Sequence, residues 1–273
     1  MALKQKHVAA RATAGWLLAI ILFFPVFWMG LAAFKTEMDA IAWPPLFLFH
    51  PTLENFAEMQ DRVDYLGHLT NSIAVSFGST ALAILLAAPA AYAMAFFPSR
   101  RTRGTLLWIL SNKFLPAAAA LVPIYLMLVY VGWLDTLKAL ILLNLFADLP
   151  IVVWMLYSYF KEIPAEIIEA SRLDGARPYQ QLLQLLLPLA APGLASTAML
   201  AVILSWNEAF WCINVASTNA GTLALAVASF SNPEGFFWAK LSAVSLASVA
   251  PIMVFGWIAQ RQLVRGLTFG AVK

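Results

Sequence analysis

Long runs of apolar residues dominate the chain, and shorter segments between them carry most of the charges. A helix needs about 20 mostly apolar residues to cross the hydrocarbon core of a bilayer. Runs of this length occur near residues 13–34, 69–97, 105–131, 138–160, 189–211 and 239–260. The pattern predicts an all-α membrane protein, in which a bundle of six transmembrane helices forms a single domain over residues 1–273.

The second and third runs are longer than a crossing requires, and both contain proline. Pro89 lies in the second run, and Pro116 and Pro123 lie in the third. Proline removes a backbone hydrogen bond and kinks a helix. Such breaks persist in a membrane only where neighbouring helices or a cavity satisfy the freed backbone groups. We expect tilted or kinked helices at both places.

Composition agrees with this class and argues against chemistry within the chain. Of 273 residues, 62% are hydrophobic and 11% are charged, whereas a soluble domain carries about 25% charged residues. The single cysteine, Cys212, excludes an internal disulfide, and the three histidines lie far apart outside the runs. Neither a G-x-x-x-x-G-K-[ST] phosphate loop nor H-E-x-x-H nor G-x-S-x-G occurs. We therefore expect no catalytic residue, metal site, cofactor or nucleic-acid partner for this chain.

Basic residues are distributed unevenly between the two sets of connecting segments. One set, which includes both termini and residues 161–188, holds most of them: Lys4, Lys6, Arg11, Arg100, Arg101, Arg103, Lys161, Arg172, Arg177, Arg261, Arg265 and Lys273. Because positive residues concentrate on the cytoplasmic side of a membrane, both termini are expected in the cytoplasm. The acidic segment 35–68 and the segment 212–238 are then expected to face outward.

The largest cytoplasmic segment, residues 161–188, is expected to be folded. Pro164 suits the first turn of a short helix, and Glu166 has the early position that favours an acid. Gly175 suits the left-handed position just past the helix end, and Pro178 can begin a second helix that Leu187-Pro188 ends. Such a helix can dock into a groove of another protein or rest on the membrane surface.

The stretch "EASRLDGARPYQQLLQLLLP" resembles the signature loop of ABC-importer permeases. That signature reads Glu-Ala-Ala, three residues, Gly, nine residues, then Ile-x-Leu-Pro. Here Glu169, Ala170 and Ser171 occupy its start, with Gly175 at the expected distance and Leu187-Pro188 at its end. Ser171 replaces an alanine and Leu185 an isoleucine. "NKFLPAAAALVPIYL", "SWNEAF" and the C-terminal "GLTFGAVK" also resemble maltose-type carbohydrate permeases, in particular their shorter membrane subunit.

The resemblance implies a mechanism and a set of partners. Residues 161–188 would carry a coupling helix that sits in a cleft of a cytoplasmic ATPase, with Glu169, Ala170, Ser171, Asp174, Gly175, Leu187 and Pro188 as the coupling residues. Partners would be a homologous second permease chain, two ATPase subunits that bind ATP and Mg, and a periplasmic binding protein, all at the bacterial inner membrane. The segment 212–238 would touch that binding protein. The solute would be a sugar or polyol.

Other readings stay open at the level of sequence. One is a permease for another solute class, such as phosphorylated polyols. A second is a stand-alone secondary transporter, which would be expected to show internal repeats and charged relays at mid-membrane. A third is an intramembrane enzyme or assembly factor. The sequence names neither the solute nor the partner genes.

Charged residues at membrane depth are candidates for function. Lys113 and Asp148 are expected at depths that differ by about 5 Å, given 1.5 Å per helical residue, so we predict that they face the bundle interior close to one another and to the solute route. The alternative is that each snorkels or bonds separately to groups of a partner chain. Asn207 and Glu208 are expected near the outer rim, where they line the mouth of the pathway or pack against the partner chain. Trp206 and Trp211 are expected in an interfacial aromatic belt rather than a sugar-binding platform.

Overall fold

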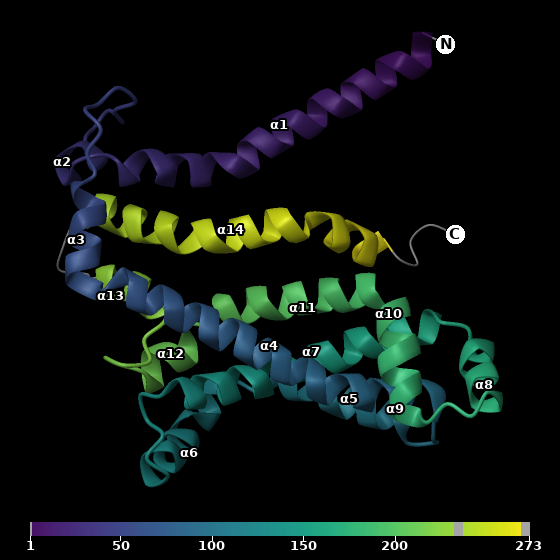
Figure 1. Cartoon of the computed structure of the whole chain (residues 1–273). Helices are drawn as coiled ribbons and strands as arrows, with labels where there is room; N and C mark the ends of the chain where they lie inside the picture. The colour runs from purple at the N-terminus through teal and green to yellow at the C-terminus, as the bar shows by residue number, and fades with distance from the viewer. Residues whose placement is uncertain (1, 232–236, 269–273) are drawn as a thin grey trace. The chain divides into compact units, whose positions relative to one another are not determined.

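The computed structural model describes residues 2–231 and 237–268, and within these ranges it is helical with no strand. Residues 232–236 of the outer segment and residues 269–273 of "GLTFGAVK" lie outside the described residues. The longer helices are α1 (Ala2–Ala33), α4 (Tyr65–Phe96), α6 (Ala117–Tyr130), α7 (Leu137–Glu162), α11 (Ala191–Trp206) and α14 (Trp238–Thr268) (Figure 1). The shorter α-helices are α2 (Glu37–Ala40), α3 (Glu54–Val63), α5 (Thr102–Ser111), α8 (Ala165–Leu173), α9 (Pro178–Gln180), α10 (Leu187–Leu189), α12 (Phe210–Val215) and α13 (Leu223–Phe230). A 3₁₀ turn (Asn112–Phe114) follows α5, and a π-helical turn (Gln181–Leu186) follows α9.

Among the described residues, four helices are long and apolar enough to cross a membrane, and six crossings result if each of two bent helix pairs counts as one. The all-α membrane fold predicted from the apolar runs is confirmed. Four of the predicted runs correspond to single helices, namely α1, α4, α7 and α14. The bounds of α4 and α7 agree with the prediction within a few residues, whereas α1 begins earlier and α14 ends later than predicted.

The other two predicted runs are not single helices. The run 105–131 is broken by an 86° bend between α5 with its 3₁₀ turn and α6. The cause is Pro116, because the residue before a proline is driven out of the helical region, and Leu115 is extended with φ −69° and ψ 122°. The run 189–211 is bent by 83° between α10 and α11, and its helix already ends at Trp206.

The described residues form two compact units, and the prediction of a single domain stays a prediction. The first unit contains residues 2–65, 226–231 and 237–250. Its helix α1 is exposed along most of its apolar length, as expected for a helix that faces lipid or another chain. Glu37 caps α14 by accepting hydrogen bonds from the backbone N–H groups of Ala239 and Lys240 at 3.0 Å each.

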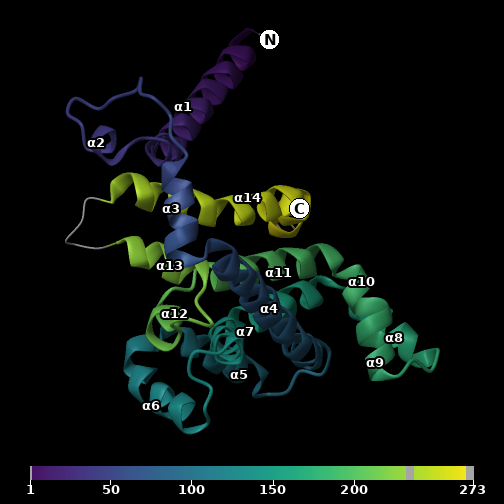
Figure 2. The same ribbon diagram turned by 60° about the vertical axis from the view of Figure 1, so that its left-hand side comes forward.

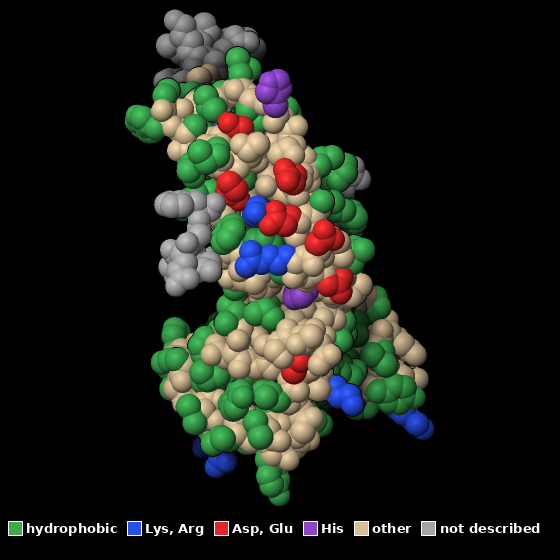
Figure 3. All heavy atoms as spheres, turned by 90° about the vertical axis from the view of Figure 1, so that its left-hand side faces the viewer, with side chains coloured by type: hydrophobic (Ala, Val, Ile, Leu, Met, Phe, Trp, Pro, Cys, Tyr) green, Lys and Arg blue, Asp and Glu red, His purple; other side chains and the backbone are tan. Residues whose placement is uncertain are grey.

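Residues 35–65 of the acidic segment belong to this first unit. Acidic side chains gather on one face of the molecule (Figure 3). Lys240 Nζ pairs with Glu58 of this segment at 2.7 Å. Lys35 is buried, donates to the Leu46 carbonyl at 2.6 Å and lies over the Trp28 ring at 4.4 Å. The buried ammonium and its carbonyl partner fix the turn after α1 to the segment that precedes α3.

The second unit contains residues 66–225 and 251–268. Its core is built where α4, α7 and α11 pack together (Figure 1). The buried face of α4 is a stripe of small residues that allows close helix approach, namely Ser72, Ser76, Ser79, Ala83, Ala87 and Ala91. Ser79 also bonds across to Ser205 of α11 at 3.1 Å. These three helices support the segments described next.

Candidate functional site

Helix α8 occupies the middle of the segment that the sequence predicts to couple to a partner. It begins after Pro164, carries Glu166 in its first turn, and ends before Gly175, which has φ +79°. The N–H of Gly175 donates to the Arg172 carbonyl at 3.0 Å, and the N–H of Ala176 donates to the Ser171 carbonyl at 2.9 Å. This pair of bonds is the Schellman motif. The left-handed glycine predicted at this position is confirmed.

The two faces of α8 differ in burial. Ile168 and Ser171 point into the core shared with α4 and α7, and the Ser171 hydroxyl donates to the Ile168 carbonyl at 2.7 Å. Side chains on the opposite side are exposed: Glu169, Ala170, Asp174 and Leu173, the last 90% exposed. Within the described residues Glu169 forms no ion pair. One face of α8 therefore holds the helix on the protein, and the other is open to a partner.

The second half of the segment also follows the prediction from sequence. Pro178 begins α9, the chain continues through the π-helical turn, and Leu187 and Pro188 form the short α10 just before the bend at Ala190. Leu187 is half-buried and Pro188 exposed. These two residues end the segment, but they do not share the exposed face of α8.

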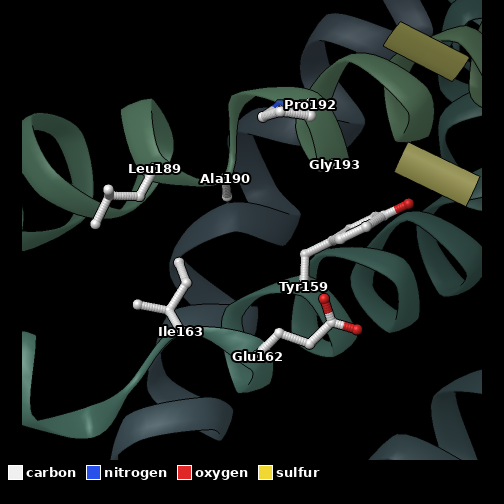
Figure 4. Close-up of a pocket in the computed structure, with 7 residues that line it drawn as sticks. All are labelled: Tyr159, Glu162, Ile163, Leu189, Ala190, Pro192 and Gly193. Carbon is white, nitrogen blue, oxygen red and sulfur yellow. The ribbon is translucent and has the colours of Figure 1, made fainter. Parts of the chain in front are cut away.

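A small pocket of about 50 Å³ lies where the end of α7 meets the α10–α11 bend (Figure 4). The Tyr159 ring lies against the backbone of Gly193, where an added Cβ would be 2.4 Å from the ring carbon Cγ. Its hydroxyl lies 2.9 Å from the Ser196 hydroxyl. Sites for small molecules usually enclose about 300–1,000 Å³. The pocket is thus a feature of close packing between α7 and α11, too small for a sugar.

The predicted contact between Lys113 and Asp148 is confirmed. Lys113 Nζ lies 3.2 Å from the Asp148 carboxylate, and the two side chains are 32% and 7% exposed. Asp148 comes from the buried face of α7, and Lys113 comes from the 3₁₀ turn at the break between α5 and α6. The break thus places the Lys113 ammonium against the buried Asp148 carboxylate, while the lysine itself stays partly exposed and does not face the interior as predicted. Their place near a solute route stays a prediction.

Asn207 and Glu208 lie in the turn between α11 and α12, so the expectation that they sit within one continuous helix to residue 211 is wrong. The Asn207 amide turns back to the Ile203 carbonyl at 2.8 Å. Both oxygens of Glu208 accept from the N–H of Trp211, at 2.9 and 3.1 Å. Side chains that bond to nearby backbone groups in this way end one helix and start the next.

The aromatic belt expected at Trp206 and Trp211 is also wrong. Their side chains are 6% and 8% exposed, so both are buried in the protein. A belt requires rings that reach the membrane–water interface. Trp211 packs instead in a core cluster with Leu140 of α7 and Cys212.

A carboxylate that the sequence did not single out organises the outer segment. Asp135, between α6 and α7, accepts bonds from the backbone N–H groups and side chains of residues 217–220, at 2.8 to 3.2 Å. Burial by itself would raise the pKa of this carboxyl, but the N–H groups of Ser217, Asn219 and Ala220 and the Ser217 hydroxyl hold the pKa well below its usual value. The donors are more than 80 residues away in the chain. From the sequence, Asp135 could be recognised only as a residue in a turn that follows Gly132, and not as the acceptor for these donors.

Comparison with known proteins gives the family. Residues 82–267 match the model described as "Binding-protein-dependent transport system inner membrane component". The chain belongs to this family. It is 35% identical to the probable ABC transporter permease protein y4oR of Sinorhizobium fredii, over 94% of this chain and 92% of that one.

Two further comparisons concern sugar transport and fold. The chain is 30% identical to the trehalose/maltose transport system permease protein MalG of Thermococcus litoralis, over 94% of each chain. It also resembles a solved bacterial ABC transporter involved in the import of the acidic polysaccharide alginate, with a TM-score of 0.76 and 19% identity over 94% of this chain and 96% of that one. The structural likeness confirms the fold, and the family is a multi-pass membrane component of transport systems.

Proposed function

We propose that this permease is one membrane subunit of an ATP-driven, binding-protein-dependent importer for a sugar or polyol. The proposal is supported by the family and by relatives named for trehalose and maltose transport. The single observation that carries it is α8, which is fixed to the core by Ile168 and presents Glu169, Ala170 and Leu173 to solvent.

The partners are those that the likeness to ABC-importer permeases implies. Two cytoplasmic ATPase subunits would receive α8 and would bind ATP and Mg. A homologous second permease chain would complete the pathway and cover apolar surface of helices such as α1. A periplasmic binding protein would deliver the solute. Closure of the ATPase pair would move α8 and rock the spans between inward-open and outward-open states.

The proposed location is the bacterial inner membrane, with both termini in the cytoplasm. Within the second unit, α8 lies at the end opposite α12, as Figures 1 and 2 both show. This arrangement supports a cytoplasmic α8 and an outward-facing segment around residues 212–223.

Gly175→Trp tests the coupling role. The residue has φ +79° and open space around its Cβ position, so tryptophan would strain the turn and project from the docking surface. We expect complete membrane insertion, reduced co-purification of the ATPase, and at least a tenfold loss of ATP-driven uptake. Gly132→Trp is the matched control, because Gly132 also has positive φ (+68°) and open space but lies in the turn after α6. Normal uptake with normal ATPase yield in Gly175→Trp would contradict the coupling role.

The solute class is tested separately. Uptake by the complete complex in proteoliposomes is measured with trehalose, maltose, a polyol and a phosphorylated polyol, each with its binding protein present. We expect transport of an uncharged sugar or polyol. Transport of only the phosphorylated compound would contradict the proposed solute class, but it would agree with the proposal that the chain is an importer subunit.

A further inference from the structure

Helix α4 contacts the coupling segment at one end and the outer segment at the other. It is a 32-residue helix, and at 1.5 Å per residue the stretch from Asn71 to Tyr92 spans about 32 Å. Its buried face packs in the same core as α7 and Ile168 of α8. Although Pro89 lies within it, α4 is continuous from Tyr65 to Phe96, so one unbroken helix joins the two contacts.

The inner contact is a buried polar connection. The Tyr92 hydroxyl donates to the Gln181 side-chain oxygen, and the Gln181 amide donates to the Ala176 carbonyl at 3.3 Å. Gln181 is 1% exposed and Tyr92 is buried, so water does not replace either bond. Ala176 is the residue whose N–H closes the turn at the end of α8. A single buried amide thus joins α4 to the end of the coupling helix.

A second contact lies beside the first. The Arg172 guanidinium, in the last turn of α8, lies over the Phe97 ring at 4.5 Å, and Phe97 directly follows α4. The Phe97 and Tyr92 rings meet edge to face, with centroids 5.5 Å apart. The end of α4 therefore holds the end of α8 through an amide bridge and through a cation–π contact.

The outer contact involves the first turns of α4. The Asn71 amide donates to the carbonyls of Asn219 and Gly221 at 3.0 and 2.9 Å. The next residue, Ser72, accepts from the N–H of Leu223 at 2.8 Å. The segment thus held is the one whose other side is bound by Asp135.

We propose that α4 is the element that connects ATPase-driven movement of α8 to the outer segment, with Tyr92 and Gln181 as positioning residues at its inner end and Asn71 at its outer end. The inference rests on the proposed function, since it requires that α8 is moved by an ATPase. Loss of the inner contact should let the ATPase cycle while α4 fails to follow. ATP would then be hydrolysed without proportionate import.

The test uses Tyr92→Phe, Gln181→Met and the double variant in the complete transporter in proteoliposomes. Tyr179→Phe is the control, because Tyr179 lies in the same segment and is exposed. Measurements are complex yield, ATP hydrolysis stimulated by the loaded binding protein, and solute import. We expect each single variant to keep its yield and ATPase activity while the ATP hydrolysed per solute imported rises about fivefold. The double variant should be no worse than the worse single variant, because both remove one connection.

A second readout follows the outer end of α4. The wild-type sequence has one cysteine, which is buried, so a Thr218→Cys variant reports on the outer segment by its rate of thiol labelling. We expect trapping of the ATPase with ADP and vanadate to change that rate in Thr218→Cys, and the change to be lost when Tyr92→Phe is added.

The proposal is overturned if both single variants keep the wild-type ratio of ATP to solute. It is also overturned if they lose complex yield and activity together, since the two residues would then serve folding alone. Absence of ATP-driven uptake in the unmodified complex would instead contradict the proposed function.

Discussion

Some residues in this protein have a structural role that the local sequence predicts, and others have a role that depends on distant parts of the chain. Gly175 is needed for a left-handed turn that the sequence anticipates, because a glycine after a helix is a common local signal. Gly193 is needed for another reason, since its φ is ordinary and the constraint is the Tyr159 ring from α7. Asp135 has a role that depends on donors far away in the chain.

Gly193→Ala should destabilise the permease. The new Cβ would lie 2.4 Å from the Tyr159 ring, and overpacking of a filled contact costs about 1–3 kcal/mol. We expect a lower midpoint of thermal unfolding in detergent and a reduced yield. Gly104→Ala, also in a helix but with open space at its Cβ position, is the control and should unfold as the wild type does. Equal stability of the two variants would show that the ring moves aside without cost.

Asp135→Asn should loosen residues 217–220. An amide group in place of one carboxylate oxygen would face N–H donors, so we expect faster proteolytic cleavage there than in the wild type. Because the folded pKa of Asp135 lies below the unfolded value of about 4, its stabilisation is fully present above that value and is lost as pH falls through the folded pKa. Protection in the wild type should therefore be constant from about pH 5 to about pH 8.

The control for this comparison is Asp61→Asn, which changes an exposed carboxylate on α3. It should leave the cleavage of residues 217–220 unchanged. A marked loss of wild-type protection between about pH 8 and about pH 5 would contradict the assignment of the low pKa.

At the scale of elements, the break between two helices positions a charged side chain that a continuous helix would not place there. The break between α5 and α6 satisfies the constraint set by Pro116, and it places Lys113 where it reaches Asp148 of α7. Discontinuous helices in transporters often supply such groups near the substrate. The pair also places a positive charge beside the buried Asp148 carboxylate, whose burial without a partner would be costly.

Lys113 and Asp148 should behave as a coupled pair. We expect Lys113→Met and Asp148→Asn each to reduce complex yield and uptake, because each leaves one charge without its partner. The double variant should lose less than the sum of the singles, with an interaction energy of about 0.5–3 kcal/mol. Lys138→Met, at an exposed lysine near the start of α7, should have little effect. Strict additivity in the double variant would show that the contact has no energetic consequence.

At the scale of the molecule, the second unit has the proposed coupling segment, with α8, at one end and an ordered outer segment, with α12, at the other (Figure 2). The exposed tip of the outer segment is residues 217–219. The side chain of Asn219 is used internally to bind Asp135, whereas at Thr218 only the backbone N–H is used. Thr218 is therefore the better position from which to probe a docked partner.

Thr218→Cys should form a cross-link to the periplasmic binding protein when a thiol-reactive reagent is added to the assembled transporter. Glu166→Cys on α8 should form a cross-link to the ATPase instead, since it lies on the opposite end of the second unit. The buried Cys212 keeps the background low. A cross-link from Thr218→Cys to the ATPase and from Glu166→Cys to the binding protein would contradict the proposed orientation. If no position among residues 217–219 forms a cross-link to the binding protein in a trapped complex, docking at this tip is contradicted.

The sequence by itself determined the class of fold, the approximate crossings, the short helix that ends at Gly175, and the Lys113–Asp148 contact. These depend on local signals: apolar length, proline and glycine positions, and the cost of an unpaired charge at depth. Tertiary structure alone decided where Trp206 and Trp211 lie, where α11 ends, and which residues connect α4 to both ends of the second unit. The physical reason is that tryptophan is apolar enough for a lipid interface or a protein core, and only packing chooses between them. Likewise Tyr92, Gln181 and Asp135 show no sequence pattern, because their hydrogen-bond partners are brought to them only by the packing of distant helices.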